Sequence, residues 1–472
     1  MTRRALRIAG VVWALLGLVA CNVAGPAEPR GGPRPGEGRL VLYLNGPAAA
    51  PLEVTFELAS IEAVLEGDAR FPVAVSPIRI NSLEVVERQI LLAESFLPEG
   101  RYKHLSLSVR KARVRQEGKW LDLSAPSDGF VLAADFEIRH GDATALFATW
   151  DVGRTVEREA FFRPAFAFEG RGHELRRVLA YVTNEASDTV SVIDRSLDRV
   201  VSVVAVGRRP RGITVARDTS RAFVVNSGSN TLSIIDINTN RVMHSTNLEL
   251  GASPSQVVIT PDRRTLYVTN TALNSVSVID AQSFQTIRTV AVGLRPEALA
   301  LIPSRAGLLV ANSGSNTLSL IDTVRNAVAA EIPVDFQPSN LAVDPTGSQA
   351  FVPHLASPRV SIVSLSSLRT VRTVTVGVSA AVLPEGDGSF SRFFVAQTRD
   401  RRVSLFDAAV NAQLDSIPVD DEPVYLELDP EREKLYVVNR GSDTVTVIDK
   451  FSRRVRATIQ VGKRPYAIAV VP

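Results

Sequence analysis

The chain has 472 residues, of which 45% are hydrophobic and 22% charged. Its 53 Lys and Arg face 50 Asp and Glu, and residues 1–20 contain three of the arginines and no acid. Without those 20 residues the two signs are therefore equal. Such a balance lacks the positive surface expected of a dedicated nucleic-acid binder, and the single cysteine excludes a disulfide framework. Stability must come from a hydrophobic core, which this apolar content can supply.

The first 20 residues have the pattern of a secretory signal peptide. Three arginines within residues 3–7 precede an apolar run at residues 8–20. A run of roughly 13 residues is too short to cross a bilayer as a helix, and a basic segment before a short apolar one is typical of an export signal. The sequence therefore predicts an exported protein.

Residues 18–21 read Leu-Val-Ala-Cys and resemble the lipobox of bacterial lipoproteins. The resemblance implies that Cys21 is lipidated and becomes the N-terminus, with at least two acyl chains that hold the protein stably to a membrane. Asn22 in place of aspartate implies the outer membrane of a Gram-negative cell, facing the periplasm or the surface. A plain signal peptide with an incidental cysteine is the alternative. Residues 21–38, rich in Pro and Gly, are expected to form a semi-extended tether.

Residues 39–170 predict a β-sandwich. Apolar residues alternate with polar ones at 54–58 and again at 105–109, as in strands with one buried face. Residues 91–96 are expected to form a short helix within this domain.

Two stretches of this region resemble an uncharacterised β-sandwich family found at the N-termini of bacterial secreted lipoproteins. They are Leu-Pro-Glu-Gly-Arg-Tyr at 97–102 and Phe-Arg-Pro-Ala-Phe at 162–166. The resemblance implies a fold and no activity. Residues 171–177 are expected to link this domain to the next.

The remaining chain repeats one unit of 42 to 44 residues seven times. One marker position follows a short apolar strand: Asn184, Asn226, Asn270, Asn312, His354, Gln397 and Asn439. A second marker ends the next strand ten residues later: Asp194, Asp236, Asp280, Asp322, Ser364, Asp407 and Asp449. A period of this length, with several short strands per unit, is typical of the blades of a β-propeller. The predicted fold is all-β, a seven-bladed β-propeller preceded by a β-sandwich.

The repeat also resembles a known family. Residues 181–184 and 267–270 both read Tyr-Val-Thr-Asn, and Val-Ile-Asp ends the strand after each of them. These motifs resemble the bacterial and archaeal YVTN family of propellers, whose YncE-like members are exported. The resemblance covers residues 178–472 and implies a propeller domain over that range.

The two ends of the repeat region predict how the ring closes. In five units a proline lies 16 residues before the first marker: Pro210, Pro254, Pro296, Pro338 and Pro423. The sixth unit has Ala381 at that distance, and the first unit has no such strand of its own. The missing strand recurs at 464–472, so we expect the C-terminus to complete the first blade and remove its open edge.

The sequence predicts no catalytic residue, no metal site and no cofactor. The five histidines lack metal-ligand spacing, and no haem-attachment motif is present. The repeated Asn and Asp are interpreted as structural, because an aspartate after a strand bonds the backbone of its own turn. The same holds for the turn residues Asp188, Asn230, Asn274, Asn316 and Asp443.

Two sets of residues are candidates for ligand binding. Loops that enter the innermost strands of a propeller share a face with the loops after the Asn positions. That face is expected to carry, just before the prolines, Arg209, Arg295, Gln337 and Arg464. Converging arginines can bind a carboxylate, a phosphate or an acidic peptide, whereas the alternative is that they are solvated loop residues.

Units five and six supply the second set. His354 and Gln397 replace asparagine there, and Arg399 and Arg401 cluster nearby. A sector that breaks its own repeat is either specialised or has drifted.

These features favour a lipid-anchored, monomeric protein of the cell envelope, whose propeller is a non-enzymatic scaffold. It is expected to bind an envelope protein or a small anionic ligand on its loop face. One alternative is a lactonase-like or other propeller enzyme of the periplasm, and another is a surface structural protein. The neutral charge balance disfavours nucleic acid as a partner.

Overall fold

The computed structural model describes residues 34–127, 129–157, 161–168, 178–303, 305–385, 391–429 and 431–471. These residues form two groups of β-sheets, with two short 3₁₀ turns at Val152–Arg154 and Arg217–Thr219. Over the described ranges, no helix is both long enough and apolar enough to span a membrane. The signal peptide, Cys21, the tether up to residue 33 and the linker 171–177 lie outside the described residues.

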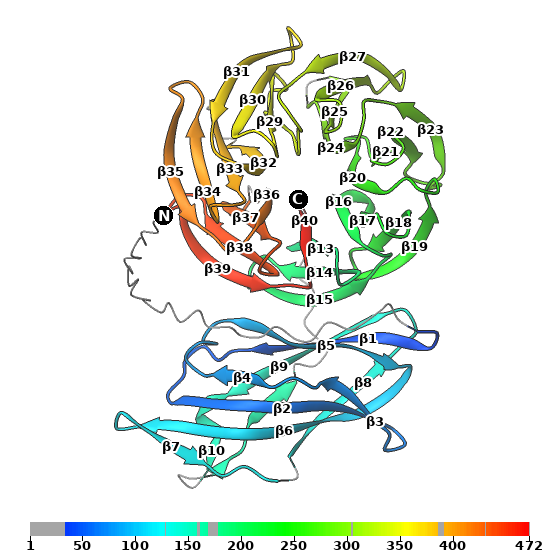
Figure 1. The fold of residues 1–472 in the computed structure, drawn as a ribbon. Coiled ribbons are helices and arrows are strands. Elements are labelled where there is room, and N and C mark those ends of the chain that lie inside the picture. The colour runs from blue at the N-terminus through cyan, green and yellow to red at the C-terminus, as the bar shows by residue number, and fades with distance from the viewer. Residues whose placement is uncertain are drawn as a thin grey trace, which may run out of the picture.

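The first group contains two larger sheets that face each other (Figure 1). One has the order β12-β9-β1-β5 and consists of Ala165–Phe168, Ala143–Asp151, Glu37–Asn45 and Gln89–Pro98. The other joins β3 (Arg70–Ala74), β2 (Glu53–Leu65), β6 (Gly100–Gln116) and β7 (Lys119–Leu123), with β4 (Ile78–Asn81) on β2 and β8 (Phe130–Ile138) on β6. A short pair, β10 (Val156–Glu157) and β11 (Phe161–Phe162), completes the group. We call these the N-terminal sheets.

The expected helix at residues 91–96 is wrong, because these residues belong to strand β5. This strand pairs antiparallel with β1 over its whole length, with one register shift. Leu92 joins the core between the N-terminal sheets, whereas its neighbour Leu91 packs on the opposite side of the sheet. A strand covered on both faces loses the polar alternation that identifies a strand in sequence.

Aromatic side chains fill the core between the N-terminal sheets. The ring of Phe56 lies 5.2 Å from that of Trp150 in an edge-on arrangement and 5.0 Å from that of Phe162. The indole nitrogen of Trp150 donates to the hydroxyl of Thr155 at 2.8 Å, so its polar atom has a partner although the side chain is buried. Both sheets therefore share one core, as an alternating pattern of strands requires.

The second group consists, within the described residues, of seven four-stranded antiparallel sheets arranged as a ring (Figure 1). From the centre outward they are β40-β13-β14-β15, β16–β19, β20–β23, β24–β27, β28–β31, β32–β35 and β36–β39. We number these ring sheets 1 to 7 in chain order. The all-β prediction is confirmed.

The strands of ring sheets 1 to 4 have the following bounds. Sheets 1 and 2 contain β40 (Pro465–Val470), β13 (Leu179–Asn184), β14 (Thr189–Asp194), β15 (Arg199–Ala205), β16 (Pro210–Ala216), β17 (Arg221–Asn226), β18 (Thr231–Asp236) and β19 (Arg241–Asn247). Sheets 3 and 4 contain β20 (Pro254–Ile259), β21 (Thr265–Asn270), β22 (Ser275–Asp280), β23 (Thr286–Ala291), β24 (Pro296–Leu301), β25 (Gly307–Asn312), β26 (Thr317–Asp322) and β27 (Ala327–Pro333).

Ring sheets 5 to 7 follow the same plan with a shorter innermost strand in sheet 5. They contain β28 (Ala342–Val343), β29 (Gln349–Pro353), β30 (Arg359–Ser364), β31 (Arg369–Thr375), β32 (Ser379–Pro384), β33 (Arg392–Gln397), β34 (Arg402–Asp407), β35 (Ala412–Pro418), β36 (Pro423–Asp429), β37 (Lys434–Asn439), β38 (Thr444–Asp449) and β39 (Arg454–Gln460). In sheet 2 the proline Pro210 pairs with the marker Asn226, whereas in sheet 6 the residue that pairs with the marker Gln397 is Ser379. The expected equivalence of Ala381 to the prolines is therefore wrong by two residues.

The repeated asparagines hold neighbouring strands together. The amide nitrogen of Asn270 donates to the hydroxyls of Ser275 at 3.0 Å and Ser277 at 2.8 Å, on the next strand. The same contact recurs in four further ring sheets, at Asn184, Asn226, Asn312 and Asn439. The structural interpretation of these residues is confirmed.

The repeated aspartates stabilise the turns after their strands. In ring sheet 3, Oδ1 of Asp280 accepts from the backbone nitrogens of Gln282 at 3.0 Å and Ser283 at 2.7 Å. The hydrogen bond from Ser283 lowers the pKa of Asp280, since it favours the charged carboxylate. These carboxylates are engaged by their own turns, as expected.

The C-terminal strand closes the ring as predicted. Strand β40 pairs antiparallel with β13, with Ile468 opposite Val182. Gly462 precedes this strand, and a Cβ there would lie 2.7 Å from Cγ of Asn184. Glycine is therefore required where the end of the chain passes the first marker residue, because a side chain would collide with it.

The N-terminal sheets pack against ring sheets 1 and 7. Val41, Tyr43 and Leu91 share a hydrophobic core with residues of β15 and β38, among them Val200 and Val447. Strand β1 is thus buried on both sides, against β2 and β6 on one side and against the ring on the other. The outermost strands of the other ring sheets are largely exposed, whereas β15 is buried or half-buried along its length.

Polar contacts fix the register of this packing. The side-chain amide of Gln89 donates to the carbonyl of Val200 at 3.0 Å and accepts from its backbone nitrogen at 2.9 Å. The backbone nitrogen of Leu91 donates to Oε1 of Gln460 at 2.7 Å. Because these bonds and the apolar contacts join the same strands, the N-terminal sheets cover the place where the first and last ring sheets meet.

Candidate ligand-binding site

A cavity of about 650 Å³ opens at the end of the ring where the innermost strands begin. It receives at least one residue from each ring sheet or the loop that enters it: Tyr466, Arg211, Gln256, Glu297, Asn340, Ala380 and Tyr425. We call this cavity the mouth. Its volume lies within the range of small-molecule sites.

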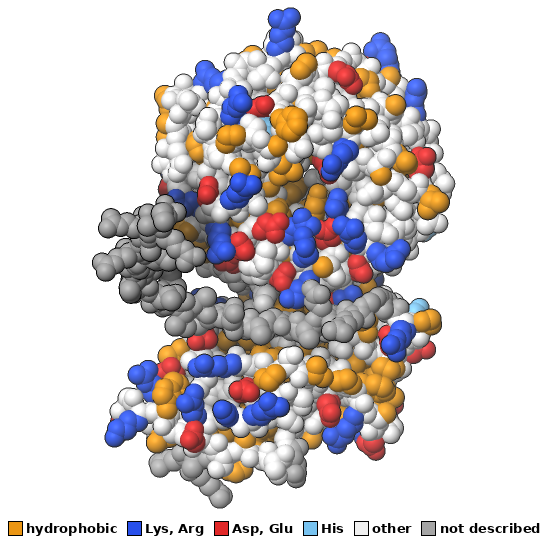
Figure 2. Space-filling model, in the orientation of Figure 1, with side chains coloured by type: hydrophobic (Ala, Val, Ile, Leu, Met, Phe, Trp, Pro, Cys, Tyr) orange, Lys and Arg blue, Asp and Glu red, His pale blue; other side chains and the backbone are white. Residues whose placement is uncertain are grey.

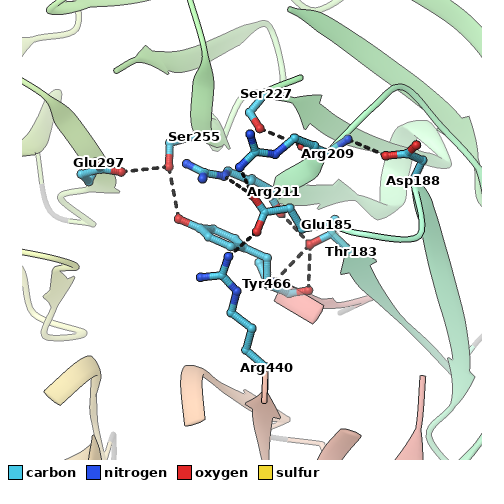
Figure 3. Close-up of polar contacts among 11 residues, drawn as sticks. Thr183, Glu185, Asp188, Arg209, Arg211, Ser227, Ser255, Glu297, Arg440 and Tyr466 are labelled. Carbon is cyan, nitrogen blue, oxygen red and sulfur yellow. Dashed lines mark hydrogen bonds and ion pairs between the residues drawn. The ribbon is translucent and has the colours of Figure 1, made fainter. Parts of the chain in front are cut away.

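A buried glutamate organises one side of the mouth (Figure 3). Glu185 follows Asn184 on ring sheet 1, and only 3% of its side chain is exposed. Its Oε1 accepts from Nη2 of Arg209 at 2.8 Å and from Nε of Arg211 at 3.1 Å, and its Oε2 accepts from Nη2 of Arg440. Three guanidinium groups from ring sheets 2 and 7 thus converge on one carboxylate.

Tyr466 of the closing strand completes this side of the mouth. The guanidinium carbons of Arg211 and Arg440 lie 5.2 Å and 5.9 Å from the centre of its ring, within reach of cation–π attraction. Its hydroxyl lies 3.3 Å from that of Ser255, which also bonds Glu297 (Figure 3). The aromatic ring therefore holds the two arginines beside the open cavity.

The charges of this cluster do not cancel. Burial acts to raise the pKa of Glu185, but Arg211, Arg209 and Arg440 outweigh it, so the pKa lies below its usual value and the residue is ionised at neutral pH. One carboxylate thus pairs with three guanidinium groups, and Glu297 adds a further negative charge that acts on Arg211. Arg211 stays protonated, because Tyr466 and Glu185 offset the cost of its burial and raise its pKa. The cluster is therefore a site of excess positive charge that is partly shielded from water.

The sequence prediction missed Glu185, Arg211, Arg440 and Tyr466. Glu185 and Arg440 each follow the first marker, where other units have a small hydroxyl residue such as Ser227 or Ser313. Those hydroxyls donate to the carbonyls of Arg209 and Arg295, at 3.0 Å and 3.1 Å. The sequence feature that could have identified Glu185 and Arg440 is a charged residue at a position where most other units have a hydroxyl that bonds a backbone carbonyl.

Three predicted candidates do line the mouth, namely Arg295, Gln337 and Arg399. Nη2 of Arg295 lies 3.4 Å from Oε1 of Glu297, so its charge is partly neutralised. The residue that follows the first marker hydrogen-bonds to the loop before the next proline. For example, the backbone nitrogen of Ser313 donates to the carbonyl of Arg295. The expectation that these loops share one face is confirmed.

Arg209 and Arg464 line a neighbouring cavity of about 620 Å³, which also contains Glu185 and Arg440. Both have left-handed backbones, with φ of 52° and 49°. A turn carboxylate holds each of them, since Asp188 accepts from the nitrogen of Arg209 and Asp443 from that of Arg464, both at 2.7 Å. Arg295 and Gln337 have the same conformation, so the repeated turn residues fix the backbones from which these side chains project.

His354 and Arg401 lie outside the lining of both cavities. His354 is fully buried, and Nε2 of its ring lies 2.9 Å from the hydroxyl of Ser361, so it replaces the asparagine contact of other ring sheets. Burial lowers the pKa of His354 to about 4, and the ring is neutral at physiological pH. Nε of Arg401 pairs with Oδ1 of Asp421 at 3.0 Å on the exposed surface.

Glu427 is a further acidic residue on an innermost strand of the ring. It lies two residues after Tyr425 on β36, so both side chains project from the same face of the strand. Burial, with a contribution from Asp429, raises the pKa of Glu427 to about 8. The residue is thus a mostly neutral carboxylic acid at pH 7.

Across the described ranges, no group of three or more His, Cys, Asp or Glu is placed to hold a metal ion. The mouth is lined by four arginines and two glutamates, Glu297 and Glu422, together with tyrosines and amides. The excess of guanidinium groups suits the binding of an anion by charge and hydrogen bonds.

No protein-family model matches the sequence, and no curated protein matches it. Among solved structures, Kuenenia stuttgartiensis hydrazine synthase is similar with a TM-score of 0.51 and 22% identity, over 55% of this chain and 89% of that chain. A functionally unknown protein from Desulfotomaculum acetoxidans is similar with a TM-score of 0.54 and 16% identity, over 62% of this chain and 98% of that chain. At these identities the likeness concerns the fold alone. It defines the class: the ring belongs to a protein of the β-propeller type.

Proposed function

We propose that this protein is a non-enzymatic, lipid-anchored scaffold of the cell envelope, which binds a small anionic ligand or an anionic segment of a protein at the mouth. In this proposal the seven ring sheets are the blades of a seven-bladed propeller of the YVTN, YncE-like kind. The N-terminal sheets are a β-sandwich that carries the tether. Cys21 is the lipidated residue, and the protein faces the periplasm or the surface from the outer membrane.

One observation carries the binding proposal: the single carboxylate of Glu185 is shared by Arg209, Arg211 and Arg440. Burying an uncompensated positive charge is unfavourable, so a second anion at the mouth would be attracted to this cluster. The arginine side chains are pre-positioned by Glu185 and Tyr466, which reduces the entropy lost when a ligand binds. Figure 2 shows charged side chains gathered on the side of the central hollow nearest the N-terminal sheets.

The binding test uses inorganic phosphate and citrate as probes in isothermal titration. Arg211→Gln and Arg440→Gln should each weaken binding by about tenfold or more, since a hydrogen bond to a charged group contributes on the order of 1.5–3 kcal/mol. Arg325→Gln is the matched control, because this arginine is exposed and pairs with Asp322 away from the mouth. If neither probe binds, or if the two mouth variants bind like the wild type, the proposal fails.

Anchoring has a separate test. Cys21→Ser should move the protein from the membrane fraction to the soluble fraction of fractionated cells, because the acyl chains can no longer be attached. A serine variant that stays with the membrane contradicts the lipoprotein part of the proposal and leaves the binding part standing.

In the enzyme alternative Glu427 is the candidate general acid or base because its pKa is raised, although it is not among the residues that line the two cavities. A lactonase-like hydrolase predicts that Glu427→Gln abolishes turnover of a lactone substrate, whereas the scaffold proposal predicts no turnover by the wild type. The alternative of a surface structural protein predicts ordered self-assembly of the purified chain.

A further inference from the structure

Ring sheets 5 and 6, away from Arg211 and Arg440, supply an apolar part of the lining of the mouth, beside Arg399 of sheet 6. Phe336, from the loop before ring sheet 5, and Leu355, from the turn after β29, both line the cavity. Their side chains are 53% and 51% exposed. Val378 and Ala380 extend this apolar wall toward ring sheet 6. Figure 2 shows hydrophobic side chains around the part of the hollow away from the charged cluster.

The two apolar residues occupy positions whose side chains are not fixed by the repeat. Leu355 follows the first marker, where Ser227, Ser313 and Thr398 donate hydroxyl hydrogen bonds to backbone carbonyls. Phe336 lies two residues before its proline, a position that varies among the other units: Arg208, Ala252, Leu294, Asp421 and Lys463. The repeat therefore does not require either side chain, and each leaves a large apolar group facing water.

We propose that the ligand is an amphipathic anion, whose charged head lies between Arg211 and Arg440 and whose apolar tail lies on Phe336 and Leu355. This inference rests on the proposed function, and it names the chemical class of ligand. The two walls belong to one cavity, so a single molecule can contact both. A cavity of about 650 Å³ leaves room for a tail after a carboxylate has been placed.

The physical reason is that the two walls favour different parts of one ligand. Guanidinium groups pair with a carboxylate through charge-assisted hydrogen bonds, which give orientation. Exposed aromatic and aliphatic side chains gain by removing a tail from water, and each fully buried methylene raises affinity by up to about fourfold. A fully hydrophilic anion would leave the apolar wall in water and gain nothing from it.

The test compares octanoate with acetate, using inorganic phosphate as a head without a tail. Octanoate, kept below its micellar concentration, should bind the full-length protein at least about tenfold more tightly than acetate. Phe336→Ala and Leu355→Ser should each weaken octanoate by several-fold, on the order of the loss of one or two buried methylenes, and leave acetate and phosphate unchanged. Both residues are half-exposed, so the variants should fold.

Leu250→Ala is the matched control, because Leu250 is 89% exposed and does not line the mouth. This variant should bind octanoate like the wild type. The inference is wrong if octanoate and acetate bind with equal affinity, or if neither Phe336→Ala nor Leu355→Ser changes the affinity for octanoate. Either result leaves the proposal of anion binding unaffected. Octanoate binding that survives Arg211→Gln, together with no binding of phosphate, would instead overturn the proposed function.

Discussion

Ring sheets 1 and 7 meet along one seam, and charged clusters at its two ends differ in their balance. Away from the mouth, Arg195, Lys434 and Arg456 pair with Asp429, Glu431 and Asp198, three charges of each sign. At the end beside the mouth, Arg209, Arg211 and Arg440 all pair with Glu185, so the guanidinium groups outnumber the carboxylate that they share.

The difference separates two roles of buried charge. Arg195 and Asp429 are 1% and 0% exposed and lie 3.0 Å apart, so each compensates the other and the pair joins the first sheet to the last. The two charges of this pair balance each other, so the pair attracts no further anion. The cluster at the mouth joins the same sheets but keeps a positive excess beside an open cavity. Ring closure is a sufficient reason for the balanced cluster around Arg195. It does not explain why the cluster around Glu185 has more positive than negative charges.

The largest expected effect comes from removing the closing strand. Deletion of residues 463–472 should abolish cooperative unfolding, because it exposes the edge of β13 and removes Ile468 and Val470 from the core. Each such side chain contributes roughly 1.5–3 kcal/mol, against a total stability of about 5–15 kcal/mol. Circular dichroism melts measure this, and an unchanged melting temperature would show that the seam does not depend on the strand.

A smaller effect is expected from breaking the balanced cluster. Asp429→Asn should lower the free energy of unfolding by about 3–5 kcal/mol, since it leaves the guanidinium of Arg195 buried without its main counterion. Anion affinity at the mouth should stay unchanged. Urea unfolding and phosphate titration on the same variant measure both quantities, and a variant with normal stability but weaker anion binding would reverse the roles assigned to the two clusters.

Glu427, which lies on ring sheet 7 near the seam, should make stability depend on pH. Its pKa is raised from 4.5 to about 8, so its contribution is fully present below pH 4.5 and is lost as the pH rises through 8. Urea unfolding at pH 5 and pH 9 should show the wild type losing on the order of a few kcal/mol more than Glu427→Gln between the two. Parallel losses in both proteins would mean that this carboxyl ionises normally.

The smallest expected change is also the most specific. Glu185→Gln removes the negative charge that the three arginines share but keeps an amide oxygen that can accept their hydrogen bonds, so inorganic phosphate should bind about tenfold more tightly, corresponding to about 1.4 kcal/mol. If the cluster around Glu185 serves only to close the ring, this substitution will lower the stability of the protein and leave its phosphate affinity unchanged. Glu431→Gln at the other end of the seam is the control, since it removes a half-exposed carboxylate from the balanced cluster.

The sequence predicted the ring because its structural residues are local and repeated. Asn270 bonds residues five and seven positions ahead, and Asp280 bonds its own turn, so the spacing of either contact is visible in one unit. The closing strand was predicted for the same reason, since 464–472 repeats the pattern of other innermost strands. The helix expected at 91–96 failed because the ring covers the second face of β5, which depends on packing between distant segments.

The binding site was predicted only in part, for a related reason. The arginines before the prolines were found because they occupy a repeated position, and three of the seven ligand-binding candidates line the mouth. His354 broke the repeat and yet proved to be a buried substitute for asparagine. Glu185 and Arg440 are 255 residues apart, and no local pattern connects them.

The sequence by itself thus determined the all-β repeat, its marker residues and the closing strand, because these depend on contacts within a unit or on its period. The tertiary structure alone decided which charges meet. Ring closure brings the first, second and last sheets to one cavity, and there the positions that do not repeat converge. The docking of the N-terminal sheets over the seam was decided in the same way, by apolar faces of β1, β5 and β15 that are far apart in the chain.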